Sequence, residues 1–509
     1  MMPAASALPE TFRHMSMASG IRCNVARDPG KTALICGEHR LTYGQLVDRI
    51  DRVRAVAVGL GLKPGDRAAI IAGNCLEYIE IVDGLAEAGI AVATLNPRHT
   101  AAELGYILQD CGARIAFVSA DAEPLVRAAD APTLERIIVI GTDYDLLLQE
   151  AHPAAAPDIA EWNAFAIPYT SGTTGKPRGV VLPHRSRVLT GFCMASEYGC
   201  YGPDDSFLAV TPLFHGAGYS FAHASVFFGG TCEILPAFDA GQTLRQLHHG
   251  GITGTFLVPT MFHAMFALEP ALLDRLRGHT LRALMSNAAP LPQRTKEIIV
   301  DYFGDGLLYE LYGSTEAGIV CSLRPRDQLR KQQCVGHPFM MNQVRLLDDN
   351  GHPVERGTVG ELFSNSPCLF LGYWNNPQAT AAAMRDGWFS AGDLAWQDDD
   401  GCTYIVDRKK DMYISGGINV YPREVEEILF RLPGVREAAV IGTPDAYWGE
   451  TGKVFLVLED GATLSPDAVI AACKQQLAGY KVPRHVAFID NLPRNAAGKV
   501  LKTELRTLP

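Results

Sequence analysis

Helical and strand patterns alternate along the first third of the chain, and this alternation limits the folds open to it. Three short apolar runs have the length of buried strands and lie at residues 68–72, 90–95 and 113–118. A helical period covers residues 76–88, and Thr42 and Thr100 each stand three residues before a Gln or Glu, as in a capping box. Strands that alternate with helices form parallel sheets covered on both faces, so the pattern predicts an α/β fold.

A charged run, Asp-Arg-Lys-Lys-Asp at residues 407–411, separates two apolar strands and marks the clearest domain boundary. Beyond it the pattern predicts a helix over 422–432 and strands over 437–441 and 454–458. A further helix begins at Pro466, with Ser465 as its cap. The residues after the run therefore form a small separate domain.

Composition excludes several classes of protein. Hydrophobic residues make up 47% and charged residues 20%, as in ordinary globular proteins, and the net charge of −11 argues against general nucleic-acid binding. The 12 cysteines include no C-x-x-C pair, which favours a reduced cytoplasmic protein over a zinc ribbon or a disulfide framework. No apolar run reaches the roughly 18 residues of a membrane helix, and the N-terminus does not resemble a signal peptide.

The most informative motif is Tyr-Thr-Ser-Gly-Thr-Thr-Gly-Lys-Pro-Arg-Gly at residues 169–179. Its glycines expose backbone N–H groups, its hydroxyls add O–H donors, and Lys176 adds a mobile positive charge. This composition favours phosphate binding over a plain surface loop. The motif is not a Walker A loop, because Pro177 follows Lys176 where that loop has Ser or Thr.

This motif resembles the signature of the adenylate-forming superfamily, which includes acyl-CoA synthetases, peptide-synthetase adenylation domains and beetle luciferases. Six further motifs follow in the family's order, at residues 212–216, 286–291, 312–316, 388–393, 407–410 and 492–499. Seven matches in order are not expected by chance, and they favour the branch of fatty-acid and aryl-acid CoA ligases. The resemblance implies an N-terminal domain of mixed sheets and helices over residues 1–407, a hinge at 408–410 and a small mobile α+β domain over 411–509.

The resemblance also implies a reaction in two steps. A small-molecule carboxylate attacks the α-phosphorus of ATP in the presence of Mg²⁺, which yields an acyl-adenylate and pyrophosphate. The thiol of coenzyme A then takes the acyl group. Such chemistry depends mainly on positioning and on charge stabilisation. Homodimers are common among relatives, and the oligomeric state itself is not readable from this sequence.

By resemblance, the ATP site uses residues from five of the motifs. The β- and γ-phosphates would be held by Thr170, Ser171, Gly172, Thr173, Thr174, Gly175 and Lys176. Thr315 would contact the α-phosphate and Glu316 would bind Mg²⁺, which prefers oxygen ligands. The adenine would lie between Tyr312 with Gly313 and the segment of Ala288, Ala289 and Pro290. Asp393 would accept hydrogen bonds from the ribose, with Arg408 assisting.

The remaining assignments concern the two half-reactions. Lys499 would bridge the substrate carboxylate and the α-phosphate and stabilise charge in the transition state. His215 would position groups or gate the thiol tunnel. Lys410 would be the hinge residue, and Gly416 and Gly417 would line the tunnel, although a plain β-turn is the alternative for this glycine pair.

The acyl pocket is expected to include His215, Gly216, Ala217, Asn287 and Gly313. Asn287 departs from the glycine that is usual in the family, so its side chain would narrow the pocket or offer a polar contact. The expected substrate is therefore an aromatic, alicyclic or short- to medium-chain monocarboxylic acid, with an aromatic acid favoured.

Four other functions are compatible with part of this pattern. An amino-acid adenylation domain would need an acid after His215, and residues 216–220 contain none. A stand-alone acyl-AMP ligase that loads a carrier protein shares the first half-reaction and stays open. Luciferase-type oxygenation and a non-catalytic nucleotide-binding module are disfavoured. One candidate basic cluster for the anionic ATP and coenzyme A consists of Lys176, Arg178, His184, Arg185 and Arg187, although a solvated face is the favoured interpretation.

Overall fold

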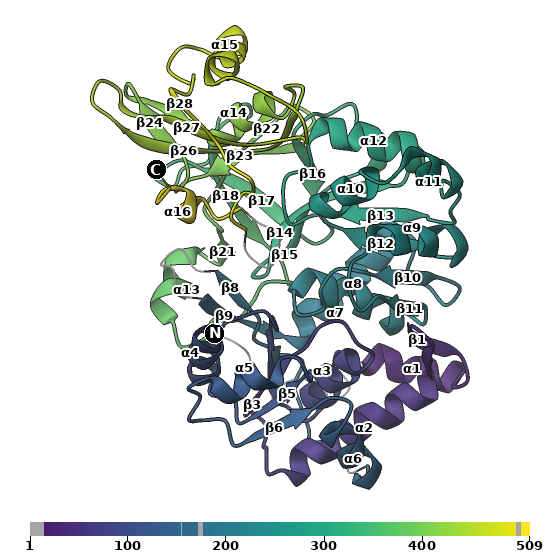
Figure 1. The fold of residues 1–509 in the computed structure, drawn as a ribbon. Coiled ribbons are helices and arrows are strands. Elements are labelled where there is room, and N and C mark those ends of the chain that lie inside the picture. Colours follow the sequence, from purple (N-terminus) through teal and green to yellow (C-terminus); the bar gives the residue numbers. More distant parts are fainter. Residues whose placement is uncertain (1–14, 154, 172–176, 495–499, 509) are drawn as a thin grey trace.

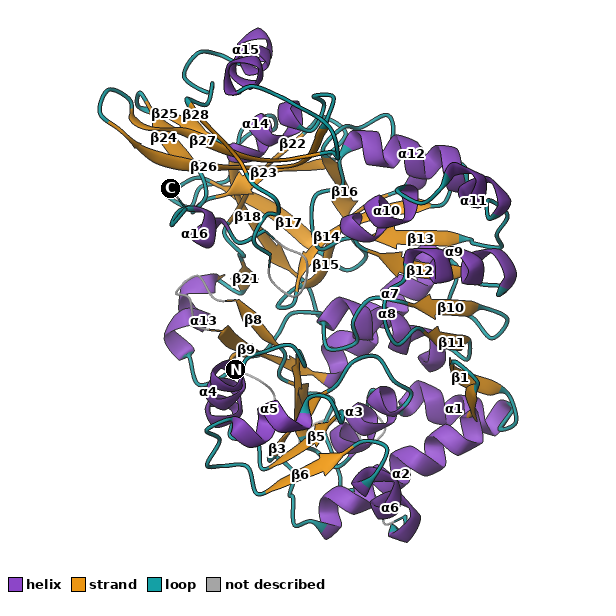
Figure 2. Cartoon of the chain, viewed as in Figure 1, coloured by secondary structure: helices purple, strands orange, loops and turns teal. Residues whose placement is uncertain are grey.

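The computed structural model describes residues 15–153, 155–171, 177–494 and 500–508. It contains three β-sheets, and helices cover the two large ones (Figures 1 and 2). Within the described residues, none of the helices is long and apolar enough to cross a lipid bilayer.

The eight-stranded sheet confirms the alternation seen in the first third of the chain. Its strands are β3 (Arg67–Ile71), β4 (Ala91–Leu95), β5 (Ile115–Val118), β6 (Arg136–Val139), β7 (Ala164–Ala166), β8 (Tyr169–Ser171), β9 (Pro177–Pro183) and β19 (Gly372–Tyr373). Strands β3 to β6 pair in parallel, as expected for strands joined through helices. Both predicted capping boxes are present, at Thr42 and Thr100.

The fifteen-stranded sheet changes character at its middle. Its strands are β1 (Thr32–Cys36), β2 (His39–Thr42), β10 (Ser206–Ala209), β11 (Thr231–Ile234), β12 (Gly254–Leu257), β13 (Ala283–Ser286), β14 (Leu308–Ser314), β15 (Gly318–Leu323), β16 (Cys334–Pro338), β17 (Gln343–Leu347), β18 (Gly360–Asn365), β20 (Met384–Arg385), β21 (Trp388–Phe389), β22 (Asp393–Gln397) and β23 (Thr403–Arg408). Strands β10 to β14 pair in parallel, whereas those after β14 pair in antiparallel fashion. The loop between β14 and β15 stands at this change.

Helices fill the layers around these two sheets. They are α1 (Ser19–Arg27), α2 (Tyr43–Gly59), α3 (Glu77–Glu87), α4 (Ala101–Cys111), α5 (Glu123–Ala128), α6 (Asp143–Glu150), α7 (His184–Tyr198), α8 (Gly216–Phe227), α9 (Ala240–His249), α10 (Pro259–Phe266), α11 (Pro270–Arg275), α12 (Gln293–Phe303) and α13 (Pro377–Ala383). One continuous apolar core joins residues of both sheets with α2, α3, α7 and α8. Helix α3 is buried from Tyr78 to Glu87 and packs against α2 and against strands β3, β4 and β7.

A smaller domain follows the charged run, which confirms the mixed α/β architecture of a large N-terminal and a small C-terminal domain. Its five strands and three helices are β24 (Tyr413–Ser415), β25 (Ile418–Val420), β26 (Val435–Asp445), β27 (Gly449–Leu458), β28 (His485–Phe488), α14 (Pro422–Leu429), α15 (Pro466–Gln476) and α16 (Lys502–Leu505). The domain has its own apolar core and lies beside the β22–β23 end of the large sheet (Figure 1). The exact boundary at 407–411 and the mobility of this domain stay predictions.

Candidate active site

The motif predicted to bind phosphate, at residues 169–179, lies on a hairpin of the eight-stranded sheet. Thr170 pairs with Arg178, and Ser171 pairs with Pro177, so β8 and β9 run antiparallel up to the loop between them. The loop residues Gly172, Thr173, Thr174, Gly175 and Lys176 lie outside the described residues. At the base of the hairpin, the Tyr169 hydroxyl donates to Asp110 at 2.5 Å. The hairpin is thereby tied to α4.

The β14–β15 loop carries Thr315 and Glu316 at the middle of the large sheet. Gly313 is required here, because a Cβ at this position would collide with the carbonyl oxygen of Gly318. The hydroxyl of Ser314 accepts a hydrogen bond from the Ala317 amide at 3.2 Å and closes the turn. This tight turn fixes the directions of the two intervening side chains.

Glu316 is held both by its backbone and by its carboxylate. Its carbonyl oxygen accepts from the Phe370 amide at 2.8 Å, and its Oε1 accepts from the Tyr373 hydroxyl at 2.8 Å. The Arg178 guanidinium lies over the Tyr373 ring, 5.6 Å from its centroid. Tyr373 therefore links the phosphate-motif hairpin to Glu316, a link that no motif in the sequence indicated.

Tyr312, Asp393 and Arg408 meet in one cluster. The Tyr312 hydroxyl donates to Asp393 Oδ2 at 2.6 Å, and Arg408 Nε lies 3.2 Å from Asp393 Oδ1. Burial, followed by the charge of Asp393, raises the pKa of Tyr312 well above its usual value, so the phenol stays protonated and remains a donor. Asp393 and Arg408 face each other on β22 and β23, so the strand pairing brings together two motifs that lie 15 residues apart in the chain.

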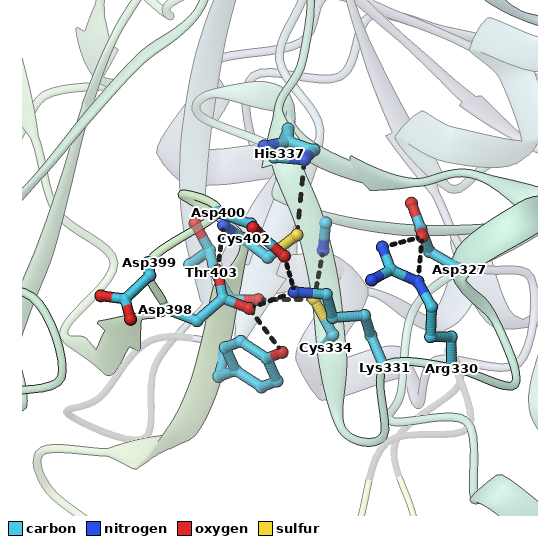
Figure 3. A network of polar contacts seen from close by, with 12 residues as sticks. Asp327, Arg330, Lys331, Cys334, His337, Asp398, Asp399, Asp400, Cys402 and Thr403 are labelled. Atoms are coloured by element: carbon cyan, nitrogen blue, oxygen red, sulfur yellow. Dashed lines mark hydrogen bonds and ion pairs between the residues drawn. The ribbon is translucent and has the colours of Figure 1, made fainter.

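The far end of the β22–β23 hairpin is braced by a polar network (Figure 3). Lys331 Nζ lies 2.5 Å from Asp398 and 2.6 Å from Asp400, and the Tyr404 hydroxyl donates to Asp398 at 2.9 Å. Beside it, Cys402 Sγ lies 3.4 Å from His337 Nε2 on β16. The network ties the turn end of the hairpin to β16 and to the segment before it.

The segment predicted to contact adenine follows β13. Ala288 has a positive φ of 77°, a conformation that is strained for a residue with a side chain. Ala288 and Pro290 are exposed, whereas Asn287 and Ala289 are half-buried. The segment ends at Leu291, whose amide donates to Glu310 Oε1 at 3.4 Å. The backbone at this position is therefore held in a conformation that presents Ala288 to solvent.

His215 stands immediately before α8 and is half-buried against Phe214, with ring centroids 4.7 Å apart. A Cβ on Gly216 would lie 3.9 Å from Thr315 Cγ2, so the His215 motif and the Thr315 loop are neighbours. Ala217, the next pocket residue, is also half-buried. The helix is anchored from its other face, where Tyr219 donates to Asp83 of α3 at 2.8 Å.

The glycine pair of the small domain forms a tight hairpin turn. Gly416 and Gly417 have φ values of 60° and 80° and connect β24 to β25, with Ser415 paired to Ile418. Two positive φ values are typical of a type I′ turn, so the β-turn alternative is confirmed as the local structure. A Cβ on Gly416 would lie 2.7 Å from the Trp448 ring. The turn is thus packed against an aromatic side chain, and its part in a thiol tunnel stays a prediction.

Lys410 and Lys499 belong to the two ends of the small domain. Lys410 is exposed, next to Lys409, whose amide donates to Gly392 at 2.9 Å. Lys499 lies outside the described residues. The chain on either side of it is joined by an antiparallel bridge between Arg494 and Val500. Both roles remain predictions.

Two members of the predicted basic cluster, His184 and Arg187, are buried instead of lying on a solvated face, whereas Arg178 and Arg185 are half-buried and Lys176 lies outside the described residues. His184 is fully buried and its Nδ1 accepts from the Met17 amide at 3.1 Å, while burial lowers its pKa to about 4. Arg187 is only 7% exposed, and Arg185 is paired with Glu161 at 3.0 Å. The expectation was wrong because α7 is packed between the sheets, which a short charged stretch in the sequence does not reveal.

The chain matches two protein-family models. Residues 21–374 match the AMP-binding enzyme family, and residues 424–499 match the C-terminal domain of AMP-binding enzymes. Together these matches reach from the first helix to the last predicted motif.

Among curated proteins, a feruloyl-CoA synthase from Amycolatopsis sp is 36% identical over 490 residues, covering 94% of this chain and 96% of that protein. A fatty acid–[acyl-carrier-protein] ligase from Streptomyces coeruleorubidus is 35% identical over 490 residues, covering 94% of this chain and 93% of that protein.

Among solved structures, ATP-bound MatB from Rhodopseudomonas palustris superposes with a TM-score of 0.89 at 31% identity, covering 96% of this chain and 98% of that one. The resemblance inferred from seven motifs is thereby confirmed. This chain belongs to the AMP-binding enzymes of the adenylate-forming superfamily.

Proposed function

We propose that this enzyme is an ATP-dependent carboxylic acid–CoA ligase, which first adenylates an acid and then transfers the acyl group to coenzyme A. The observation that carries the proposal is that the Tyr312–Asp393–Arg408 cluster and the Thr315–Glu316 loop lie together at the middle of the large sheet, where its parallel half meets its antiparallel half. One strand, β14, leads from the first group to the second. The cluster would therefore bind the nucleoside of ATP, and the neighbouring loop would bind its phosphates.

Different residues of this site would bind the ribose, the phosphates and the adenine of ATP in the first half-reaction. Asp393 has two carboxylate oxygens already oriented by Tyr312 and Arg408, which suits it to accept from the two ribose hydroxyls. Thr315 would donate to the α-phosphate, and the hairpin with Thr170, Ser171 and residues 172–176 would hold the outer phosphates. Ala288, Ala289, Pro290 and Gly313 would frame the adenine.

The donor set fits a magnesium ion brought in with ATP. The described residues contain no cluster of three or more His, Cys, Asp or Glu side chains able to hold a metal alone. Mg²⁺ commonly uses one or two carboxylates together with substrate phosphates and water. Glu316 supplies such a carboxylate, since the Tyr373 hydroxyl donates to Oε1 and orients the group. When bound, the ion would neutralise developing charge on the phosphates.

Lys499 would complete the site for adenylation by placing an ammonium group between the two reacting anions. A rotation of the small domain at Lys410 would then withdraw Lys499 from the active site and bring in the Gly416–Gly417 turn. His215 would lie where the acyl group and the thiol meet. The order of the motifs supports these assignments, and His215 and Lys499 also lie within the two family matches.

The acid is proposed to be an aromatic, alicyclic or short- to medium-chain monocarboxylic acid, with an aromatic acid favoured. Gly216 and Ala217 leave room beside His215, while half-buried Asn287 would limit the length of the chain that fits. The similarity to a feruloyl-CoA synthase supports an aromatic acid. A cytoplasmic location and a homodimer are further proposals, and light scattering would measure the latter.

A stand-alone acyl-AMP ligase that loads a carrier protein is the second candidate, favoured by the similarity to a carrier-protein ligase. One experiment tests both. A panel of acids (benzoate, ferulate, cyclohexanecarboxylate, octanoate and palmitate) is assayed for pyrophosphate release with and without coenzyme A. Thioester formation with free coenzyme A supports the first candidate. Acyl-AMP that accumulates and is consumed only by a phosphopantetheinylated carrier protein supports the second, and no pyrophosphate release with any acid contradicts both.

A further inference from the structure

Arg187 is a buried cation that none of the sequence motifs explains. It lies on α7, directly behind the β14–β15 loop, and only 7% of it is exposed. Its guanidinium donates to two backbone carbonyls, those of Thr315 and, at 3.2 Å, Cys368. Burial lowers the pKa of Arg187 to about 10, so the group stays charged at neutral pH.

The two carbonyls belong to segments that meet at Glu316. The Phe370 amide and the Tyr373 hydroxyl, which bond to Glu316, follow Cys368 closely in the chain. Arg187 therefore joins the same two segments from the buried side. The contact with α7 is close, since a Cβ on Gly318 would lie 3.3 Å from the Thr190 hydroxyl.

A packing role alone does not account for a charge at this place. Burying a guanidinium costs free energy, and an apolar side chain of similar length would fill the same space without that cost. The planar fork of arginine can bond two acceptors in fixed directions, which neither lysine nor an apolar residue can do. The Glu316 carboxylate also attracts the cation, and this attraction opposes the effect of burial on the pKa of Arg187.

We propose that Arg187 is a positioning residue for the first half-reaction, which holds Thr315 and Glu316 in register with the segment that carries Tyr373. The proposal rests on the roles proposed for Thr315 and Glu316 in adenylation. Misplacing reacting groups by about 1 Å can cost on the order of 100-fold in rate, so a backbone tether at this loop is of catalytic consequence.

The test compares Arg187→Met, Arg187→Lys and the control Arg185→Met, which changes the neighbouring arginine paired with Glu161. Pyrophosphate exchange measures adenylation, with the acid of the panel that is turned over fastest. Thioester formation from synthetic acyl-adenylate and coenzyme A measures the second step, which needs no magnesium. Circular dichroism and thermal melting report folding.

We expect both Arg187 variants to lose about 10- to 100-fold in kcat for exchange, with a higher Mg²⁺ requirement and less than about threefold change in the second step. If Arg187→Met does not fold, Arg187→Lys decides, because it keeps the charge but lacks the planar fork that directs two hydrogen bonds. Equal losses in both steps, or no loss, would overturn the proposal. A parallel Glu316→Gln variant distinguishes a failure of the Arg187 proposal from a failure of the role proposed for Glu316. If Glu316→Gln shifts the magnesium titration while both Arg187 variants catalyse pyrophosphate exchange at normal rates, only the role of Arg187 is contradicted.

Discussion

The Tyr312 hydroxyl donates a hydrogen bond to Asp393 Oδ2 at 2.6 Å, across a sequence separation of 81 residues. Asp393 lies on β22 and Tyr312 on β14, strands that are not neighbours in the large sheet. This bond orients the carboxylate that is proposed to bind ribose. The motif predicts that the Tyr312 ring packs on adenine, and the structure shows that its hydroxyl also orients Asp393.

Removing this hydroxyl is the first test. Tyr312→Phe should raise the KM for ATP by about tenfold or more, because a hydrogen bond to a charged group contributes roughly 1.5–3 kcal/mol. The measurement is pyrophosphate exchange at varied ATP. Tyr302→Phe is the matched control, since that hydroxyl donates to the Leu273 carbonyl away from the site. An unchanged KM for Tyr312→Phe would show that the orientation of Asp393 does not depend on this bond.

Lys499→Ala should reduce adenylation by about 100- to 1,000-fold, because it removes a charge that stabilises the transition state. Conversion of added acyl-adenylate to thioester should persist. The two half-reactions are measured separately, with Lys474→Ala, an exposed lysine on α15, as the control. Equal loss of both half-reactions would contradict the proposed role of Lys499.

Lys410→Pro should impair thioester formation far more than adenylation. Proline restricts φ and would resist a rotation of the small domain at this residue. Lys410→Ala removes the same side chain without this restriction and is the control. If the proline variant carries out both steps at normal rates, Lys410 is not the hinge.

Glu316→Gln should raise the magnesium concentration needed for half-maximal exchange by about tenfold, which corresponds to about 1.4 kcal/mol. The amide keeps the size of the side chain and an oxygen for Tyr373, but loses the charge that attracts the cation. Glu355→Gln, at an exposed position, is the control. A superimposable magnesium titration would place the metal ligand elsewhere.

Asn287→Gly should shift the preferred substrate toward bulkier or longer acids. Each methylene that newly fits an apolar pocket contributes about 1–3 kcal/mol, so ratios of kcat/KM between longer and shorter acids should rise about tenfold or more. Asn350→Gly, at an exposed position, is the control. An unaltered specificity profile would mean that Asn287 does not line the pocket.

The sequence alone was enough to predict the elements that depend on local pattern. The capping boxes at Thr42 and Thr100, the helix that begins at Pro422 and the parallel strands β3 to β5 all follow from spacing within short windows. The motifs were likewise enough to predict the superfamily, because their order along the chain is itself a sequence property.

Only the tertiary structure determines the contacts between segments that lie far apart in the chain. The pairing of Tyr373 with Glu316 and the burial of Arg187 behind Thr315 join residues 57 and 128 positions apart. Arg187 was expected in solvent because a run of basic residues usually is solvated. Whether a charged side chain faces water or a backbone carbonyl depends on which layers close over it, and that information lies in the packing of α7 between two sheets rather than in the sequence around it.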